Sequence, residues 1–395
     1  MSPVKDTRPF TDAEVPAVIE SLLHDKEFLG FIARFRFPVL SKFLPGLLRW
    51  GVARVLRSQV GRVTTIAGFQ QIVSTYARKL VKDTMTSFDF SGIEKLSKQS
   101  AYLFVGNHRD IAGDSMLVDY ALYLSGYDTV RIAVGDNLVQ KDFATHLMKL
   151  NKSFFIKRSE EGAKKIYAGL LESSRYIHDC ISQGESIWIA QAEGRAKDGM
   201  DLTDPAIIKM FALAERKNTL PEILQKLHIV PVSISYEYDP CDAMKAKELY
   251  SLRTEGCYRK DEGEDLLSLV KGLGEFKGRV ILTIGDMLKP EFETADAIAA
   301  EIDRQVLSNL RLYPVNFWAL CCLADDDSID CDIYRTALQQ LQGLEGVKLP
   351  DSDDPSVLKA RFEECPPEHR RDMLAMYANP VLNKLNHHLI PEFES

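Results

Sequence analysis

The stretch Tyr102-Leu-Phe-Val-Gly-Asn-His-Arg-Asp-Ile-Ala-Gly-Asp-Ser-Met-Leu-Val-Asp-Tyr120 decides the fold class. Its first residues are apolar and typical of a buried strand, and Gly106 and Asn107 allow a sharp turn after it. From Met116 onward, apolar side chains recur at helical spacing. The carboxyl end of a strand that leads into a helix is where α/β proteins place chemical groups and bind anions, and His108 lies there.

Short apolar runs alternate with helix-length segments beyond this stretch. The runs lie at residues 102–105, 130–134, 154–156, 186–190, 229–234 and 280–284. This alternation predicts an α/β fold with a central, mostly buried sheet flanked by helices. An amphipathic helical N-terminal region, starting with a helix near residues 12–25, precedes the sheet, and a helical C-terminal extension follows it. We predict boundaries of 1–90 for the N-terminal region, 91–290 for the α/β domain and 291–395 for the extension.

The composition excludes several classes of protein. The chain has 395 residues, of which 45% are hydrophobic and 27% charged, so it can bury a large core and is not intrinsically disordered. Its seven cysteines are scattered and form no C-x-x-C pair, which predicts neither a disulfide framework nor a zinc site. The charged, proline-containing N-terminus does not resemble a secretory signal, and no apolar run reaches the roughly 20 residues of a membrane span. We expect a cytoplasmic protein.

Charge is unevenly distributed along the chain. From Phe28 to Lys82 there are ten basic residues and no acidic one, which leaves −18 for the rest of a chain whose net charge is −8. The acidic balance argues against a nucleic-acid partner. Within the basic segment, apolar side chains such as Phe43, Leu47 and Trp50 alternate with arginines. The segment therefore predicts either a peripheral surface for anionic lipid on the inner face of a membrane or ordinary helical packing.

His108 has two candidate carboxylate partners nearby in the sequence, Asp110 and Asp114. Either could accept the Nδ1 proton of His108 and leave Nε2 as a base that activates a hydroxyl for attack on an acyl group. A histidine that merely caps a loop is the alternative interpretation.

Later strand ends carry cations. Lys157 and Arg158 follow the strand at 154–156, and the loop after residues 186–190 contains Gly194, Arg195 and Lys197. A glycine loop with cations can cradle a phosphate, and arginine can bind one bidentately. Each of these patterns also occurs in plain surface turns.

Taken in order, these segments resemble the glycerol-phosphate acyltransferase superfamily over roughly residues 90–240. The four blocks that carry the resemblance are Asn107-His-Arg-Asp-Ile-Ala-Gly-Asp114, Ser153-Phe-Phe-Ile-Lys-Arg158, Glu193-Gly-Arg-Ala-Lys197 and Val230-Pro-Val-Ser-Ile234. The spacing departs from the family pattern at two points: the carboxylate of the first block is one residue later, and the arginine of the third block, Arg195, one residue earlier. Asp114 is favoured over Asp110 because the following helix continues as it does in the family.

The resemblance implies an enzyme that moves a fatty acyl group from a thioester, acyl-coenzyme A or acyl-acyl carrier protein, to a glycerol-phosphate or lysophospholipid hydroxyl in phospholipid biosynthesis. We favour 1-acylglycerol-3-phosphate as the acceptor, with no metal and no cofactor beyond the acyl donor. His108 is then the base, with Asp114 or Asp110 as its partner. The residues expected to bind substrate are Asn107, Arg109, Lys157, Arg158, Glu193, Gly194, Arg195, Lys197 and Pro231.

Two alternatives remain at this level. The chain could be a non-catalytic, peripheral membrane lipid-binding protein on the same fold, although a degenerate copy should have lost His108 or its carboxylate. It could also be a hydrolase that uses water as the acceptor, in which case the cations at Arg158, Arg195 and Lys197 would have little to bind.

Overall fold

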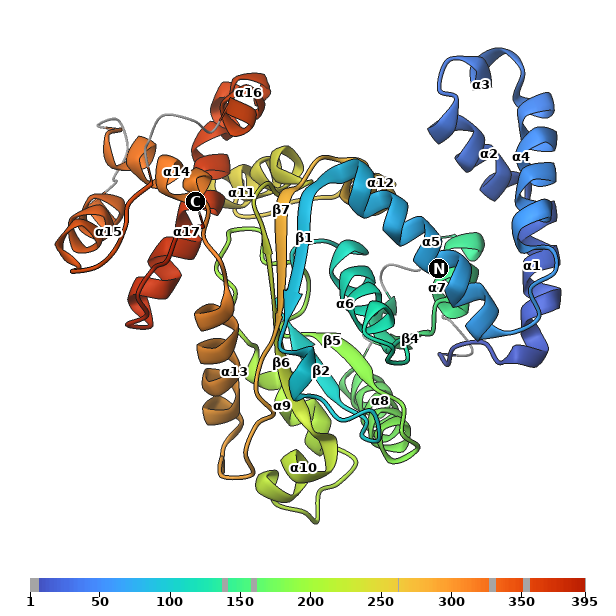
Figure 1. The fold of residues 1–395 in the computed structure, drawn as a ribbon, viewed down its shortest axis with the longest axis horizontal. Helices are drawn as coiled ribbons and strands as arrows, with labels where there is room; N and C mark the ends of the chain where they lie inside the picture. The colour runs from blue at the N-terminus through green and yellow to red at the C-terminus, as the bar shows by residue number, and fades with distance from the viewer. Residues whose placement is uncertain are drawn as a thin grey trace.

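The structure, a computed structural model, describes residues 7–136, 141–157, 162–261, 263–326, 332–350 and 356–394. Within these ranges the chain forms a seven-stranded sheet in the order β1-β7-β6-β2-β5-β3-β4. The strands are β1 (Met85–Ser91), β2 (Leu103–Gly106), β3 (Arg131–Gly135), β4 (Ser153–Ile156), β5 (Ile187–Ala190), β6 (Ile229–Tyr236) and β7 (Gly278–Ile284). Neighbouring strands are parallel except β6 and β7, which are antiparallel. Helices flank this sheet, which confirms the predicted α/β class (Figure 1).

Each face of the sheet packs against its own helices. Leu103 and Val105 of β2 belong to one core and Phe104 to the other, because successive strand residues point to opposite faces. The first core includes side chains of α8 (Ala163–Ser182), α9 (Pro205–Ala212), α10 (Leu220–Leu227) and α13 (Ala295–Asn309). The second core includes side chains of α6 (Gly113–Leu124), the helix that follows β2. Burial on both faces explains why strands such as β2, β4 and β6 are near-continuous apolar runs.

Five helices make up the N-terminal region, and all of them except α3 contribute to a third core together with α7 (Asp142–Leu150). They are α1 (Val15–His24), α2 (Lys26–Arg36), α3 (Leu40–Phe43), α4 (Pro45–Val60) and α5 (Ile66–Thr84). Ile19, Phe28 and Phe69 are buried in this core, and α1 confirms the helix expected near residues 12–25. In Figure 1, α2, α3 and α4 stand away from the sheet. Among the described residues, no helix has the length and apolar character needed to cross a bilayer.

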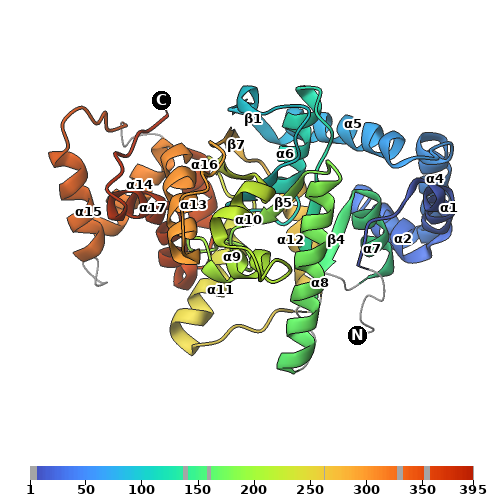
Figure 2. The same cartoon turned by 90° about the horizontal axis from the view of Figure 1, so that it is seen from below.

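The C-terminal helices pack around a fourth core of their own. They are α14 (Pro314–Ala324), α15 (Asp332–Gly343), α16 (Ser356–Glu364) and α17 (Arg370–Asn386). This core also takes in Tyr238 and Ala246, which belong to the connection between β6 and β7. That connection contains α11 (Asp242–Glu255) and α12 (Glu264–Gly274). Figure 2 shows the C-terminal helices at one end of the molecule and the N-terminal helices at the other.

Asp119 of α6 is a buried carboxyl whose Oδ1 accepts a hydrogen bond from the Val130 N–H at 2.8 Å. Burial raises the pKa of Asp119 to about 7, against the smaller opposing effect of that hydrogen bond. Since an ordinary aspartate titrates near 3.9, the folded protein loses stability as the pH rises from about 4 to about 7.

Asp119→Asn is therefore expected to increase the free energy of unfolding more at pH 8 than at pH 5. Asparagine keeps an oxygen for the Val130 N–H and carries no charge to desolvate. At about 1.4 kcal/mol per pKa unit, the gain at pH 8 has an upper bound of about 4 kcal/mol. Urea unfolding of both proteins at the two pH values measures it, and an equal gain at both would contradict the titration of Asp119.

Candidate active site

The loop between β2 and α6 is fixed to the sheet by Asn107. Its fully buried side chain donates from Nδ2 to the Ile234 carbonyl at 3.0 Å and accepts the Ile234 N–H at 2.8 Å. These two bonds join the end of β2 to the neighbouring strand β6. They hold His108, the next residue, at the carboxyl edge of the parallel part of the sheet. Asn107 therefore orients the loop and is not among the residues that line the cavity described below.

His108 and Asp114 form a hydrogen-bonded pair. Nδ1 of His108 lies 2.7 Å from Oδ2 of Asp114, whose side chain is fully buried. Oδ2 also accepts the N–H groups of Arg109 at 2.7 Å and Asp110 at 3.0 Å, and Oδ1 accepts the Tyr236 hydroxyl at 2.8 Å. A carboxylate can only accept, so Nδ1 of His108 carries a proton, and in the neutral imidazole Nε2 then has the lone pair. That is the arrangement of a general base.

The side chain of Asp110 makes its hydrogen bonds to the backbone at the start of α6 and not to His108. Its Oδ1 accepts the N–H groups of Ala112 at 3.0 Å and Gly113 at 2.9 Å, so it caps the start of α6. Among the described residues its Oδ2 has no hydrogen-bond partner. Burial, and then the nearby charge of Asp114, raise the pKa of this carboxyl. Of the two aspartates, the structure places Asp114 at the histidine.

A cavity of about 150 Å³ opens beside His108. Its apolar wall comes from β3, β4 and β5 and includes Trp188, whose ring centre lies 5.7 Å from that of His108. Its polar wall comes from the loop after β5, from the α11–α12 connection and from the first turn of α12. The polar wall residues are Glu193, Gly194, Arg195, Lys197, Lys260 and Asp265. Four of the predicted substrate-binding residues, Glu193, Gly194, Arg195 and Lys197, thus meet at the cavity.

The two predicted cations in this wall have different partners. Nη1 of Arg195 donates to the Ser268 hydroxyl at 2.7 Å, whereas Nζ of Lys197 lies 2.6 Å from a carboxylate oxygen of Glu248. The charge of Lys197 is therefore neutralised by Glu248. Ser268 is uncharged, so its contact with Arg195 does not neutralise the arginine charge. Gly194 has φ +77°, a left-handed conformation that glycine adopts without strain.

Other predicted substrate-binding residues lie away from the cavity. The guanidinium of Arg109 pairs with the buried Asp201, and Lys157 pairs with Glu172 at 3.0 Å. Pro231 is buried within β6, where its carbonyl accepts the Gly285 N–H at 2.8 Å. None of these three lines the cavity. Arg158 lies outside the described residues.

Sequence reasoning missed several polar groups around the pair. Tyr236, Trp188, Asp201 and Lys245 carry no motif of their own. Tyr236 is the last residue of β6, so a polar side chain at a strand end was the signal that could have identified it. Among the described residues, no group of three or more His, Cys, Asp or Glu side chains could hold a metal ion.

A comparison with known protein families agrees with this geometry. The model of the family described as Acyltransferase matches residues 87–235. Residues 87–235 are an acyltransferase-family domain. This match supports the acyltransferase part of the resemblance inferred from the sequence. This acyltransferase domain contains the His108–Asp114 pair and the loop from Glu193 to Lys197, and it ends one residue before Tyr236.

One similar solved structure is the 1-acyl-sn-glycerophosphate acyltransferase PlsC from Thermotoga maritima. The identity is 13% and the TM-score 0.39, with 71% of this chain and 95% of that chain covered. No curated protein matches the chain.

Proposed function

We propose that this protein is an O-acyltransferase that moves a fatty acyl group from a thioester to the hydroxyl of a glycerol-phosphate or lysophospholipid acceptor in phospholipid biosynthesis. We favour 1-acylglycerol-3-phosphate as the acceptor. The observation that carries the proposal is the contact of His108 with Asp114 at the wall of a cavity that also holds Arg195. The base and the phosphate ligand then face the same space.

The proposed reaction follows from the contact of His108 Nδ1 with Asp114, which leaves Nε2 to act as the base. Nε2 takes the proton of the acceptor hydroxyl while Asp114 stabilises the imidazolium that forms. The hydroxyl oxygen attacks the thioester carbonyl, and the carbon–sulfur bond breaks. The leaving thiolate takes the proton back from Nε2, so that an ester and a free thiol are the products. The donor is acyl-coenzyme A or acyl-acyl carrier protein.

Arg195 is the residue proposed to bind the acceptor phosphate, because it lines the cavity and its partner Ser268 is uncharged. Arg195→Ala is expected to raise the KM for the acceptor roughly 10- to 100-fold, the range that corresponds to a lost charge-assisted hydrogen bond of about 1.5–3 kcal/mol. The KM for the acyl donor should stay within about twofold. Initial rates with each substrate varied in turn measure both constants, and an unchanged acceptor KM would contradict this role.

Incubation of the purified chain with a panel of substrates tests the proposed function. The donors are acyl-coenzyme A and acyl-acyl carrier protein, and the acceptors are glycerol 3-phosphate, 1-acylglycerol-3-phosphate, uncharged monoacylglycerol and water alone. We expect phosphate-bearing acceptors to be acylated and free thiol to appear in equal amount. Thiol release without an acylated product would identify a hydrolase, and no thiol release with any donor would overturn the enzyme.

We also propose that helices α2 to α4 dock on an anionic membrane surface on the cytoplasmic face. These helices expose a row of large apolar side chains, of which Phe43 is 77% and Trp50 63% exposed. The others are Phe35, Phe37, Val39, Leu40, Leu44, Leu47 and Val55. Basic residues alternate with these apolar residues in the sequence, and the segment from Phe28 to Lys82 contains no acidic residue. Arg54 lies 5.9 Å over the ring of Trp50. Apolar insertion together with attraction to anionic lipid suits the lipid nature of the proposed acceptor and product.

The double variant Phe43→Asp/Trp50→Asp is expected to bind vesicles of phosphatidylglycerol and phosphatidylcholine at least about 10-fold more weakly than the parent. Each buried aromatic side chain contributes on the order of 1.5–3 kcal/mol. Binding of the parent should also fall as salt rises. Ile333→Asp, at a 57% exposed apolar residue of α15, is the matched control and should bind as the parent does. Equal binding by all three proteins in a sedimentation assay would refute docking through α2 to α4.

A further inference from the structure

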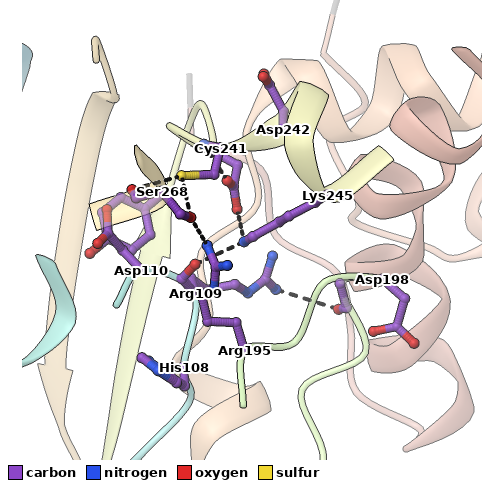
Figure 3. A network of polar contacts seen from close by, with 12 residues as sticks. His108, Arg109, Asp110, Arg195, Asp198, Cys241, Asp242, Lys245 and Ser268 are labelled. Carbon is purple, nitrogen blue, oxygen red and sulfur yellow. Dashed lines mark hydrogen bonds and ion pairs between the residues drawn. The ribbon is translucent and has the colours of Figure 1, made fainter. Parts of the chain in front are cut away.

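Arg109, the neighbour of His108, is held at both ends by buried partners. Nε of its guanidinium lies 3.1 Å from each carboxylate oxygen of Asp201, and Nη2 contacts the same carboxylate. Its backbone carbonyl accepts a hydrogen bond from Nζ of Lys245 at 2.8 Å. Lys245 is 1% exposed and also pairs with Asp239. Figure 3 shows the Lys245 side chain extending toward Arg109.

Asp201 and the Lys245–Asp239 pair are the two anchors of Arg109. Both are connected by hydrogen bonds to α17, a helix of the C-terminal extension. The Tyr377 hydroxyl accepts the Asp239 N–H at 2.9 Å and donates to Asp242 at 3.0 Å. On the other side, Nδ2 of Asn383 donates to the carbonyl of Asp201 at 3.4 Å. Hydrogen bonds from α17 therefore support both the segment that carries Lys245 and the loop that carries Asp201.

The packing of Gly199 brings the loop of Asp201 against α17. Proline has no N–H, so Pro380 inside α17 leaves the Met376 carbonyl without its usual helical donor. Gly199 sits against this carbonyl with φ +81°, and a Cβ atom there would overlap the Met376 oxygen. Nδ2 of Asn379 donates to the nearby Asp198 carbonyl at 2.8 Å. The loop that contributes Arg195 to the cavity is thus seated on the same helix.

The peptide group between Arg109 and Asp110 connects Lys245 to Asp114, the proposed catalytic carboxylate. The carbonyl of Arg109 accepts from Lys245, and the N–H of that same peptide, on Asp110, donates to Oδ2 of Asp114 at 3.0 Å. Hydrogen bonds on the two sides of a peptide group polarise it and strengthen each other. The preceding N–H, on Arg109, donates to the same oxygen at 2.7 Å. Moving Arg109 would therefore move both donors that orient Asp114 toward His108.

We infer that the C-terminal extension positions the catalytic pair by clamping Arg109 between Asp201 and Lys245. This inference rests on the proposed acyltransferase function of His108. Arg109 is then a positioning residue, whereas the resemblance had made it a substrate ligand. The clamp also gives the C-terminal helices, which lie outside the acyltransferase-family domain, a part in the reaction.

Two variants disturb the Lys245 anchor in different ways, and neither alters a residue of the cavity wall. Lys245→Met/Asp239→Asn removes the buried pair and keeps the charge balanced, and Tyr377→Phe removes one hydroxyl and keeps the ring. The matched control is Arg253→Gln/Asp372→Asn, which breaks another ion pair between α11 and α17, at 2.8 Å, without reaching Arg109. For the two clamp variants we expect kcat to fall about 10- to 100-fold, with both KM values within about twofold of the parent. The control should keep the parent's kcat.

A second readout needs no substrate. In ¹⁵N-histidine-labelled protein, the low-field proton resonance of the His108 Nδ1–H should be present in the parent and in the control and absent from His108→Ala. It should shift or broaden in both clamp variants. If the parent protein transferred no acyl group, the proposed function would be wrong. The resonance would still test whether the clamp orients His108.

Three results would overturn the clamp. The first is a parent-like resonance and kcat in both clamp variants. The second is a raised acceptor KM with unchanged kcat, which would make the network part of substrate binding. The third is an equal loss of kcat in the control, which would reduce the effect to general packing of α17.

Discussion

Replacing His108 by alanine is expected to lower kcat/KM for acyl transfer by about 10²–10⁴-fold, the usual contribution of a general base. The side chain is 14% exposed, follows the end of β2 and contributes to none of the buried apolar cores, so its loss should leave the fold intact. Its Nε2 is the atom proposed to take the acceptor proton, and no other histidine lines the cavity in the described part of the chain. Steady-state rates with the best donor and acceptor of the panel measure the effect.

The control for this prediction is the folded state of the variant. Circular dichroism and the midpoint of thermal unfolding should match the parent. His24→Ala, at an exposed histidine at the end of α1, should retain full activity. A folded His108→Ala protein with parental kcat/KM would remove His108 from the mechanism.

Asp114→Asn is expected to lower kcat by roughly 10³–10⁴-fold, as the loss of the orienting carboxylate does in other histidine-dependent enzymes. An amide at this position can present an NH₂ group to His108 and impose the wrong tautomer, which removes the free lone pair at Nε2. The variant also loses the negative charge that stabilises the imidazolium. Because Asp114 accepts from two backbone N–H groups and Tyr236, some loss of thermal stability should accompany the change.

Asp110→Asn is the matched comparison for Asp114→Asn. Asparagine keeps the oxygen that caps α6 through Ala112 and Gly113, and the other carboxylate oxygen of Asp110 makes no hydrogen bond within the described structure. We expect kcat to stay within about tenfold of the parent. Equal losses in both variants would show that the two carboxylates act as one unit, and a larger loss at Asp110 would reverse the assignment.

The strands that could be predicted are those buried on both faces. The runs at 102–105 and 229–234 are continuous apolar segments bounded by turns, and they are β2 and most of β6. Strand β1 was missed because it follows α5 directly and lies at the sheet edge, where residues alternate in exposure instead of forming an apolar run. The order of the strands depends on contacts between distant segments, which no local pattern records.

The candidate site likewise contains residues that a local sequence pattern identifies and residues that it does not. His108 could be found because the turn, the histidine and both carboxylates lie within eight consecutive residues, from Asn107 to Asp114. The direction of Arg109 could not be found, since it is decided by Asp201, 92 residues further along the chain. Tyr236 was missed for a similar reason, because its contact with Asp114 exists only once β6 lies beside β2.

The place of β7 between β1 and β6 constrains how the chain can be synthesised and divided. Met85 of β1 pairs with Gly278 of β7, so the first strand to leave the ribosome waits for the last one before the sheet can close. A fragment that stops at residue 235 would leave the long edge of β6 open to pairing with other molecules, which favours aggregation. The apolar helices α2 to α4 emerge early, whereas Tyr236 and Tyr377 emerge late. A nascent chain would thus present the surface proposed to bind lipid well before the proposed active site could assemble.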